Sequence, residues 1–406
     1  MTVQARFLEY VKYDTTSDPK SDSIPSTAKH KVLGAYLVDE LKSIGISNAF
    51  MDEFGYVYGF LSGNVQAPKI GFVAHMDTSN AVSGENIKPR IIEDYDGKDI
   101  VLSDDVITEI SRFPNMKDYI GKTLIVTDGL TLLGADDKAG IAVIIEGLDY
   151  FIKHPEVKHG KISVAFTPDE EIGRGTIKFN TEHFDCDFAY TVDGGKPHEV
   201  EYENFNAASA LVKVKGLSTH PGGAKNMMIN AINVAFEYHQ LLPTIMRPEY
   251  TEGYEGFNHL MEISGDVEQA TLSYIIRNHD EVKFNKQKEL FKQSATFINQ
   301  RYGQELIDLS ISDSYRNMKQ AFNDKMYIVE LAKQAIEAVN LQPECLAIRG
   351  GTDGAELTYK GVPCPNIGAG GQNFHSRYEF CCVEDMVKSV EIVKEIITKA
   401  VDLKID

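Results

Sequence analysis

The 406-residue chain lacks the sequence features of a secreted or membrane-embedded protein. It has only five cysteines, an odd number that includes the adjacent pair Cys381 and Cys382, so a disulfide framework is not expected. A reducing compartment is the simpler interpretation. The N-terminal segment has no uninterrupted apolar stretch, and no run anywhere approaches about 20 apolar residues. We therefore expect a cytoplasmic protein.

Basic residues are also scarce in this chain. Lysine and arginine number 41 against 60 aspartates and glutamates, which gives a formal net charge of −19. Because no basic cluster offsets this charge, neither nucleic acid nor an anionic membrane is an expected partner. The sequence has no internal repeats and no low-complexity segment. At 406 residues it is long enough to form two domains with a large core.

The sequence does contain imidazoles and carboxylates placed at the ends of predicted strands. Short apolar runs such as KIGFVA, ISVAF and FAYTV are typical of buried strands in a mostly parallel sheet. Ligands bind beyond the carboxyl ends of such strands, so five distant segments would deliver their side chains to one edge of the sheet. These side chains are His75, Asp77, Asp136, Asp137, Glu170, Glu171, Asp193 and His375.

This set of side chains is larger than one metal ion needs. A catalytic zinc ion takes three protein ligands and keeps one open position. Two histidines with at least four carboxylates suit two ions about 3.5–4 Å apart that share a bridging carboxylate. No cysteine lies in any of the clusters, which favours zinc, manganese or cobalt over an iron–sulfur centre.

Each motif, taken alone, has a plain structural alternative. The pair His75 and Asp77 could form an ordinary hydrogen bond, paired acids are usually solvated, and a lone histidine is more often structural than a ligand. Here, however, each acidic pair lies against an apolar segment, and a buried carboxylate is costly unless it is paired or metal-bound. The five segments together therefore favour a metal site.

The motifs HMDTS, LLGADDKAG, TPDEEIGRG, TVDGG and RGGTDGAEL resemble the co-catalytic zinc peptidase family that includes carboxypeptidase G and aminoacylase. The resemblance runs nearly from end to end, and the segments ENFNAAS and TEGYEGF are similar to its tripeptide aminopeptidase branch. The sequence keeps the family pattern wherever the family has a metal ligand or the general base. The resemblance implies two divalent metal ions per chain, with Zn²⁺ as the first choice, and small peptides as substrates.

The resemblance also implies how the ligands are divided. His75, Asp136 and Asp193 would hold one ion. Asp136, Glu171 and His375 would hold the other, so that Asp136 bridges the two.

The remaining site residues receive catalytic roles. Asp77 would accept the second ring N–H of His75 and so fix its tautomer. Glu170 would take a proton from the metal-activated water and pass it to the leaving amine, as the general base and acid of peptide hydrolysis. The family also implies a cis peptide bond between Asp136 and Asp137.

The predicted elements divide into two groups. Strands and helices alternate up to about residue 207, with a capped helix expected from about Ser26 to Ile44. After Ala207 the order becomes strand–helix–strand–strand–helix–strand, which is typical of the split βαβ sandwich. Its two helices are expected over Ala224–Leu242 and Glu281–Tyr302. We expect an α/β fold: a mostly parallel catalytic domain (1–207 and 320–406) with helices on both faces, and an inserted α+β lid domain (208–319). A homodimer formed through the lid domain is a further expectation.

Three residues in or near the inserted domain are candidates for substrate binding. His220 lies in the turn sequence GLSTHPGGAKN, and the resemblance implies that it polarises the scissile carbonyl. Arg277 ends an apolar strand, and Arg349 precedes two glycines that let the backbone approach a ligand closely. A guanidinium matches a carboxylate at two points, so the two arginines could hold the peptide's C-terminal carboxylate. Each residue could equally be an ordinary surface or ion-pair residue.

We therefore predict a dinuclear metal-dependent aminopeptidase that releases the N-terminal residue of tripeptides. Two alternatives stay open: a dipeptidase or N-acyl amino acid deacylase on the same scaffold, and a metal- or peptide-binding protein without turnover. Glu170 beside a full ligand set argues against the second alternative, because a binding protein needs no base.

Overall fold

The structure is a computed structural model that describes residues 1–404. The chain divides into two compact units. The first contains Met1–Tyr202, Gln320–Leu346 and the chain from Thr352 to the end of the described residues. The second contains Glu203–Lys319 together with the short segment Ala347–Gly351, which the sequence did not separate from the catalytic domain.

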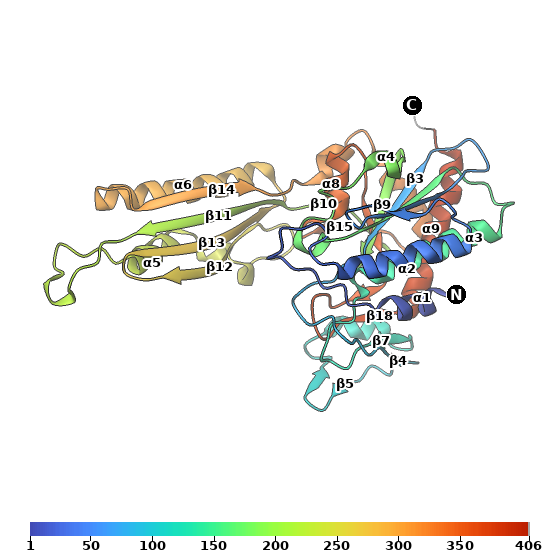
Figure 1. Cartoon of the computed structure of the whole chain (residues 1–406), viewed down its shortest axis with the longest axis horizontal. Coiled ribbons are helices and arrows are strands. Elements are labelled where there is room, and N and C mark those ends of the chain that lie inside the picture. The colour runs from blue at the N-terminus through green and yellow to red at the C-terminus, as the bar shows by residue number, and fades with distance from the viewer. Residues whose placement is uncertain (405–406) are drawn as a thin grey trace. The chain divides into compact units, whose positions relative to one another are not determined.

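The first unit is built around a large sheet flanked by helices (Figure 1). Its helices are α1 (Val3–Tyr10), α2 (Lys29–Ile44), α3 (Ala135–Lys153), α4 (Thr181–Phe184), α7 (Met326–Ala338), α8 (Asp353–Tyr359) and α9 (Val383–Lys399). The strands of the large sheet are β1 (Phe50–Met51), β2 (Val57–Leu61), β3 (Ile70–His75), β8 (Ile162–Thr167), β9 (Phe188–Gly194), β10 (Glu199–Asn204), β15 (Glu344–Ile348) and β16 (Asn366–Gly368).

The large sheet has eight strands in the order β1-β2-β8-β3-β9-β16-β10-β15. Its centre, β8-β3-β9-β16, is parallel, and the pairs β1–β2, β2–β8 and β10–β16 are antiparallel. The predicted α/β fold class is confirmed, with antiparallel strands added at the edges of the parallel centre.

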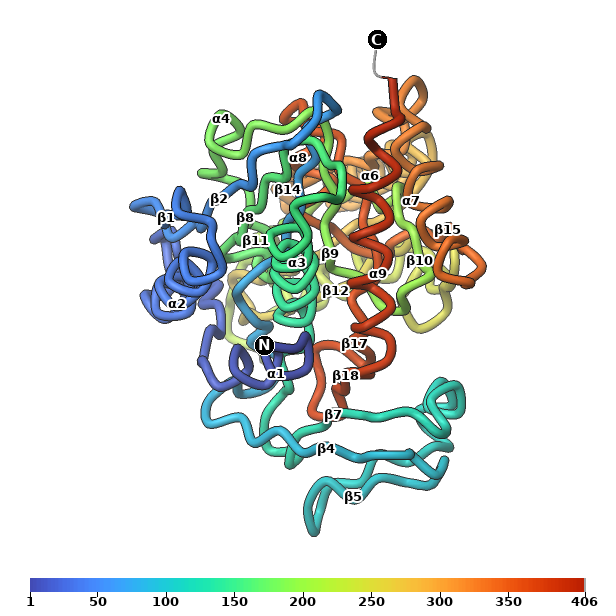
Figure 2. The backbone as a smooth tube through the Cα atoms, turned by 90° about the vertical axis from the view of Figure 1, so that its right-hand side faces the viewer, coloured from blue at the N-terminus to red at the C-terminus, as the bar shows by residue number. Residues whose placement is uncertain are grey.

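Helices cover both faces of this sheet. On one face, Phe72 of β3 stacks on Tyr190 of β9, whose hydroxyl donates to the carbonyl of Ile328 in α7 at 2.7 Å. On the other face, Val73 packs in a cluster with Phe184 of α4 and residues of α8. α3 packs against β3, β9 and α9, and Figure 2 shows α3 and α9 side by side. Successive side chains of β3 point to opposite faces of the sheet, and the side chains on both faces are buried.

One glycine allows α3 to lie directly on β9. A Cβ atom at Gly140 would lie only 1.8 Å from the backbone oxygen of Val192. Only a residue without a side chain permits this approach of helix to strand.

A second, smaller sheet is formed by the excursion between Asp77 and Asp136 and by two short strands that lie on either side of His375 in the chain. Its order is β17-β18-β7-β4, and Figure 2 shows β4, β7 and β18 next to one another. The bounds are β4 (Arg90–Ile92), β7 (Leu124–Val126), β17 (Gly371–Gln372) and β18 (Phe380–Cys382), and a separate hairpin is formed by β5 (Ile100–Ser103) and β6 (Val106–Thr108). A buried apolar cluster, including Met116, Leu124 and Phe380, joins these segments.

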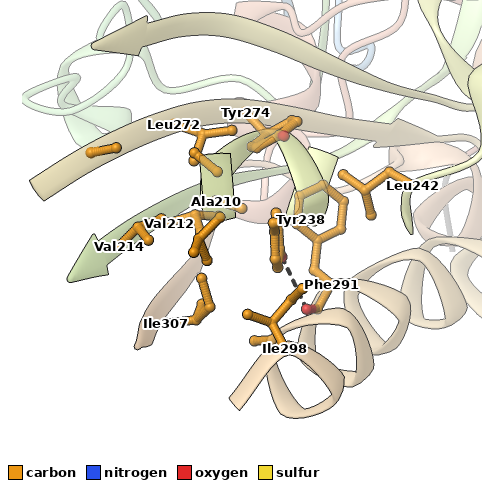
Figure 3. Close-up of a cluster of buried hydrophobic side chains, with 14 of the residues drawn as sticks. Ala210, Val212, Val214, Tyr238, Leu242, Leu272, Tyr274, Phe291, Ile298 and Ile307 are labelled. Atoms are coloured by element: carbon orange, nitrogen blue, oxygen red, sulfur yellow. Dashed lines mark hydrogen bonds between the residues drawn. The ribbon is translucent and has the colours of Figure 1, made fainter. Parts of the chain in front are cut away.

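The second unit has the predicted order of elements, and the β-α-β-β-α-β pattern is confirmed. The elements are β11 (Asn206–Lys215), α5 (Ala231–Leu241), β12 (Phe257–Gly265), β13 (Gln269–Asn278), α6 (Glu281–Tyr302) and β14 (Ile307–Asp313). The sheet is antiparallel, in the order β12-β13-β11-β14. Figure 3 shows its core, where alternate residues of β11 and β13 meet α5 and α6 and the Tyr238 hydroxyl donates to the Phe291 carbonyl at 3.0 Å.

Two predicted helix starts are wrong. The helix expected from Ser26 begins at Lys29 without a side-chain cap, because the Ser26 hydroxyl accepts the N–H of Asp18 at 3.0 Å, while the Ser26 N–H donates to the carboxylate of Asp169. The helix expected from Ala224 begins at Ala231, because Asn230 caps it by accepting the N–H groups of Ile232 and Asn233. Within the described chain, no helix combines the length and apolar character needed to span a membrane.

Candidate metal centre

Three neighbouring strands of the large sheet deliver side chains to one edge. β3 ends at His75, β9 carries Asp193 near its end, and β8 is followed by a short 3₁₀ turn, η2 (Glu170–Ile172). Because β8, β3 and β9 are parallel neighbours, these side chains meet at the carboxyl edge, as the sequence predicts.

Asp136 lies between the two histidines. Nε2 of His75 is 2.8 Å from Asp136 Oδ1, and Nε2 of His375 is 3.1 Å from Asp136 Oδ2. His75 Nε2 also lies 3.6 Å from Asp193 Oδ1, and His375 Nε2 lies 2.9 Å from Glu171 Oε2. The two oxygens of the Asp136 carboxylate thus face two separate groups of side chains that could bind metal. A ligand that bridges two ions requires this arrangement. The Asp136–Asp137 peptide bond is cis, as predicted.

Asp137, next to Asp136, is also near this cluster. Ligand atoms of His75, Asp136 and Glu171 lie within 4.8 Å of one another, and so do those of His75, Asp137 and Asp193. The carboxylate of Asp137 already accepts the N–H groups of Gly140 at 3.1 Å and His75 at 3.3 Å. These contacts indicate that Asp137 ties the start of α3 to the end of β3.

Asp77 organises the backbone beside it. Its carboxylate accepts the N–H groups of Glu170 at 3.0 Å and Glu171 at 3.1 Å, and the Ser17 hydroxyl at 2.5 Å. Nδ1 of His75 lies 3.0 Å from the Asp77 carbonyl and 3.4 Å from the Asp77 carboxylate. The predicted contact between the Asp77 carboxylate and the imidazole is therefore longer than the contact of the imidazole with the Asp77 carbonyl. The hydrogen bonds from the backbone of Glu170 and Glu171 to Asp77 were not predicted from the sequence.

Burial and mutual repulsion change the acidity of the packed carboxyl groups. Burial raises the pKa of Glu170 well above its usual value, and nearby Asp193 and Asp353 add to the rise. Burial likewise raises the pKa of Glu171 to about 7 and the pKa of Asp193 to about 6. Concentrated negative charge of this kind attracts a cation.

The pKa values of the two histidines are also raised, because the neighbouring carboxylates favour the charged imidazolium. Hydrogen bonds to Asp136 and Glu171 raise the pKa of His375 to about 11. Burial alone would lower the pKa of His75, but Asp193 and Asp136 raise it well above its usual value.

The donor set fits divalent cations. Carboxylate and imidazole donors suit zinc, manganese or cobalt. The side chain of Glu171 is only 4% exposed, and within the described chain its Oε1 has no hydrogen-bond partner. An unsatisfied buried oxygen is costly, and a bound cation would remove that cost.

Three buried acids beside the centre were not singled out from the sequence. Asp353 accepts the Thr167 hydroxyl at 2.6 Å, and Asp169 accepts the Ser26 N–H. Glu379 accepts the N–H groups of Leu133 at 2.7 Å, Gly134 at 2.8 Å and Asp136 at 3.1 Å. The one sequence signal for Glu379 is an acid inside the apolar run YEFCCV.

The three predicted substrate residues belong to the second unit. His220 is exposed, and its Nδ1 accepts the N–H of Gly222 at 3.1 Å. Arg277 donates through Nη1 to the carbonyls of Ala208 at 3.2 Å and Ile276 at 3.0 Å, and it lies over the ring of Tyr315.

Arg349 also lies in the second unit, and it contacts a neighbouring segment. It donates through Nη1 to the carbonyls of Gly253 at 2.5 Å and Glu255 at 3.0 Å, and through Nη2 to the Thr251 hydroxyl at 3.2 Å.

Comparison with known proteins identifies relatives along nearly the whole chain. The sequence profile of peptidase family M20/M25/M40 matches residues 127–399. Peptidase T of Alkaliphilus oremlandii (strain OhILAs) is 52% identical over 398 residues, which cover 97% of each chain.

Two solved structures share the fold. The aminopeptidase PepT from Bacillus cereus ATCC 10987 has a TM-score of 0.77 at 24% identity and covers 98% of each chain. A tripeptidase from Staphylococcus aureus subsp. aureus mu50 has a TM-score of 0.78 at 23% identity and covers 99% of this chain and 98% of its own.

Proposed function

The chain belongs to peptidase family M20/M25/M40, and on that basis we propose that it is a dinuclear metal-dependent aminopeptidase that releases the N-terminal residue of tripeptides. The observation that carries the proposal is the position of Glu170 beside the ligand cluster, with its backbone held by Asp77. The name of the 52% identical relative, Peptidase T, supports the choice of substrate.

We propose that His75 and Asp193 hold one ion, that Glu171 and His375 hold the other, and that Asp136 binds both. Zinc is the proposed metal, because the donors are imidazole and carboxylate. Bound divalent ions supply the Lewis acidity that activates water and polarises a carbonyl.

Glu170 is the proposed general base and acid. It receives the proton of the attacking water and delivers it to the leaving amine. Burial raises the pKa of Glu170, which makes its carboxylate a stronger base towards the proton of the attacking water. Asp77 fixes the backbone of both Glu170 and Glu171, so one residue can face the water while its neighbour binds metal.

The second unit supplies the proposed substrate contacts. Because His220 Nδ1 accepts a hydrogen bond from Gly222, a neutral imidazole carries its proton on Nε2 and can donate to the scissile carbonyl. Arg277 is the proposed partner of the peptide's C-terminal carboxylate. Both terminal nitrogens of Arg349 contact the segment Thr251–Glu255, so we propose that it shapes this segment and contacts substrate through it.

Location and assembly are also proposals. The five unpaired cysteines support a cytoplasmic location. Exposed apolar residues of the second unit, including Phe236, Met261 and Ile263, support a homodimer formed through the lid domain.

A peptide panel tests the proposed function. A tripeptide, its N-acetyl form, its C-terminal amide and the corresponding di- and tetrapeptides are assayed after chelation and after addition of zinc, manganese or cobalt. We expect two ions per chain by elemental analysis, no activity without metal, and preference for the free tripeptide. Hydrolysis of the acetylated peptide at an equal rate would instead identify a deacylase, and binding without turnover of any peptide would identify a binding protein.

Arg277→Met sharpens this test. A two-point charged contact contributes about 1.5–3 kcal/mol, so the wild type should prefer the free carboxylate over the amide by about ten- to a hundredfold. The variant should lose this preference while keeping its activity on the amide. An unchanged preference would remove Arg277 from the substrate site.

A further inference from the structure

The carboxylate of Glu379 stands out among the buried groups that the proposed mechanism does not use. It is buried, and it lies just before β18. One oxygen accepts the N–H groups of Leu133 and Gly134, and the other accepts the N–H of Asp136 at 3.1 Å. Three backbone donors from the segment that ends at the bridging residue therefore converge on one side chain.

Glu379 is also connected to His375 through a closed turn. The Ser376 hydroxyl donates to the Asn373 carbonyl at 2.6 Å, and the Glu379 N–H donates to the Ser376 carbonyl at 3.3 Å. The side chain of Asn373 donates to the Tyr378 carbonyl at 3.3 Å. These bonds hold His375 in a left-handed backbone conformation, with φ of 55°, four residues before Glu379.

The two sets of contacts join two distant parts of the chain. Glu379 holds the backbone of Asp136, and the turn that ends at Glu379 carries His375. The side chains of Asp136 and His375 meet at 3.1 Å. By contrast, His75 and Asp193 lie on the adjacent parallel strands β3 and β9. Glu379 therefore supports their position through Asp136 alone, whereas it supports the other position through both Asp136 and the turn that carries His375.

We propose that Glu379 is a positioning residue that sets the metal position formed by Glu171 and His375. The inference rests on the proposed metal pair and deepens it, because it assigns one of the two positions a structural support that the other shares only through Asp136. Glu379 acts through hydrogen bonds to the backbone and contacts no ion. Removal of an outer partner of a metal ligand lowers metal affinity by about 10- to 100-fold.

The test measures Zn²⁺ binding by competition with a chromophoric chelator and counts bound ions by elemental analysis. In Glu379→Gln, an amide nitrogen replaces one carboxylate oxygen and faces a backbone donor. We expect one of the two ions to bind about 10- to 100-fold more weakly, and the other to change much less. Glu379→Ala should show the larger loss, because Gln retains one acceptor oxygen.

Two comparisons identify the affected position. In a His375→Ala background, which removes a ligand of that position, Glu379→Gln should have little further effect on the remaining ion. Glu384→Gln is the matched control, because Glu384 also accepts a backbone N–H, that of Thr123, through both oxygens at 3.1 and 2.9 Å. The control should bind both ions as the wild type does.

The outcomes separate this inference from the proposed function. A wild-type chain that binds fewer than two ions overturns the proposed function and this inference with it. Two ions in the wild type and unchanged affinities in Glu379→Gln overturn this inference alone, as does an equal weakening of both ions. If the Glu379 variants do not fold, Asn373→Gly opens the same turn at a residue whose φ of 57° glycine adopts readily. Unchanged zinc affinity in that variant would overturn the inference.

Discussion

The first unit buries clustered acids at a sheet edge, whereas the second unit buries neutral amides. Asp77, Asp137, Asp353 and Glu379 lie within the first unit. In the second unit the side chain of Gln287 accepts from Asn278 at 2.8 Å and donates to Asn258 at 2.8 Å.

The side chains of the amide network can satisfy one another's hydrogen bonds, because each amide offers both donors and an acceptor. Glu203, an acid buried in the same unit, is paired with Lys319 at 2.7 Å. The acids of the first unit are different, since burial and mutual repulsion raise the pKa values of Glu170, Glu171 and Asp353. The difference teaches that the buried amides satisfy one another, whereas the clustered acids need bound cations to offset their burial and mutual repulsion.

The largest effect should follow from Glu170→Ala. We expect turnover to fall at least about a hundredfold, the lower range for loss of a general base, while both ions stay bound. Glu171→Ala is the matched variant, and it should lose metal at one position. Turnover and metal content, measured on the same preparations, check both statements. Identical metal content in the two variants would show that the division between base and ligand is wrong.

An intermediate effect is expected when the amide network is broken. Gln287→Leu leaves the amide of Asn278 and the carbonyl of Phe257 without their partner. The free energy of unfolding should fall by about 1–3 kcal/mol, with metal content unchanged. Urea unfolding measures the loss, and Gln293→Leu on the exposed side of the same helix is the control. A variant as stable as the control would mean that this network does not contribute to stability.

A third effect concerns the pH dependence of the free energy of unfolding. Burial and the neighbouring Glu199 raise the pKa of Glu201, on β10 of the large sheet, to about 8. The folded chain therefore holds a proton that the unfolded chain releases near its ordinary value of 4.5. Stability from this group is fully present below that value and is lost as the pH rises towards 8.

Glu201→Gln should remove this dependence of stability on pH, because the variant lacks the single proton that the folded chain binds at Glu201. Urea midpoints measured between pH 5 and pH 8 should decline less steeply in the variant than in the wild type. The exposed Glu53→Gln should leave the slope unchanged. Equal slopes in all three proteins would show that Glu201 ionises normally in the fold.

Local sequence patterns predicted the elements and the edge where the ligands meet. Apolar runs followed by a polar residue correctly place His75 and Asp193 at the ends of strands. A few consecutive residues are enough to indicate both that a strand is buried and where it ends. The bounds of α6, Glu281–Tyr302, were predicted for the same reason, since an aspartate cap and a glycine mark its two ends.

Contacts between distant segments could not be predicted in this way. The small sheet pairs β4 and β18 with β7 across long stretches of sequence, and no local pattern specifies this pairing. The acceptors Asp77 and Glu379 bind backbone N–H groups, which every residue type except proline offers, so the sequence does not reveal the partner. Ser26 was mistaken for a helix cap because a cap and a tertiary contact look alike in sequence.

The close approach at Gly140 limits how two of the proposed metal ligands are spaced. Asp136 lies in the kinked first turn of α3, and Asp193 lies near the end of β9. The helix and the strand come into contact at Gly140, since a Cβ there would lie 1.8 Å from the backbone oxygen of Val192 and 2.4 Å from Asp137 Oδ1. A single methyl group would therefore act as a wedge between helix and strand. The span of the metal centre is thus limited by a residue that has no side chain and binds no ion.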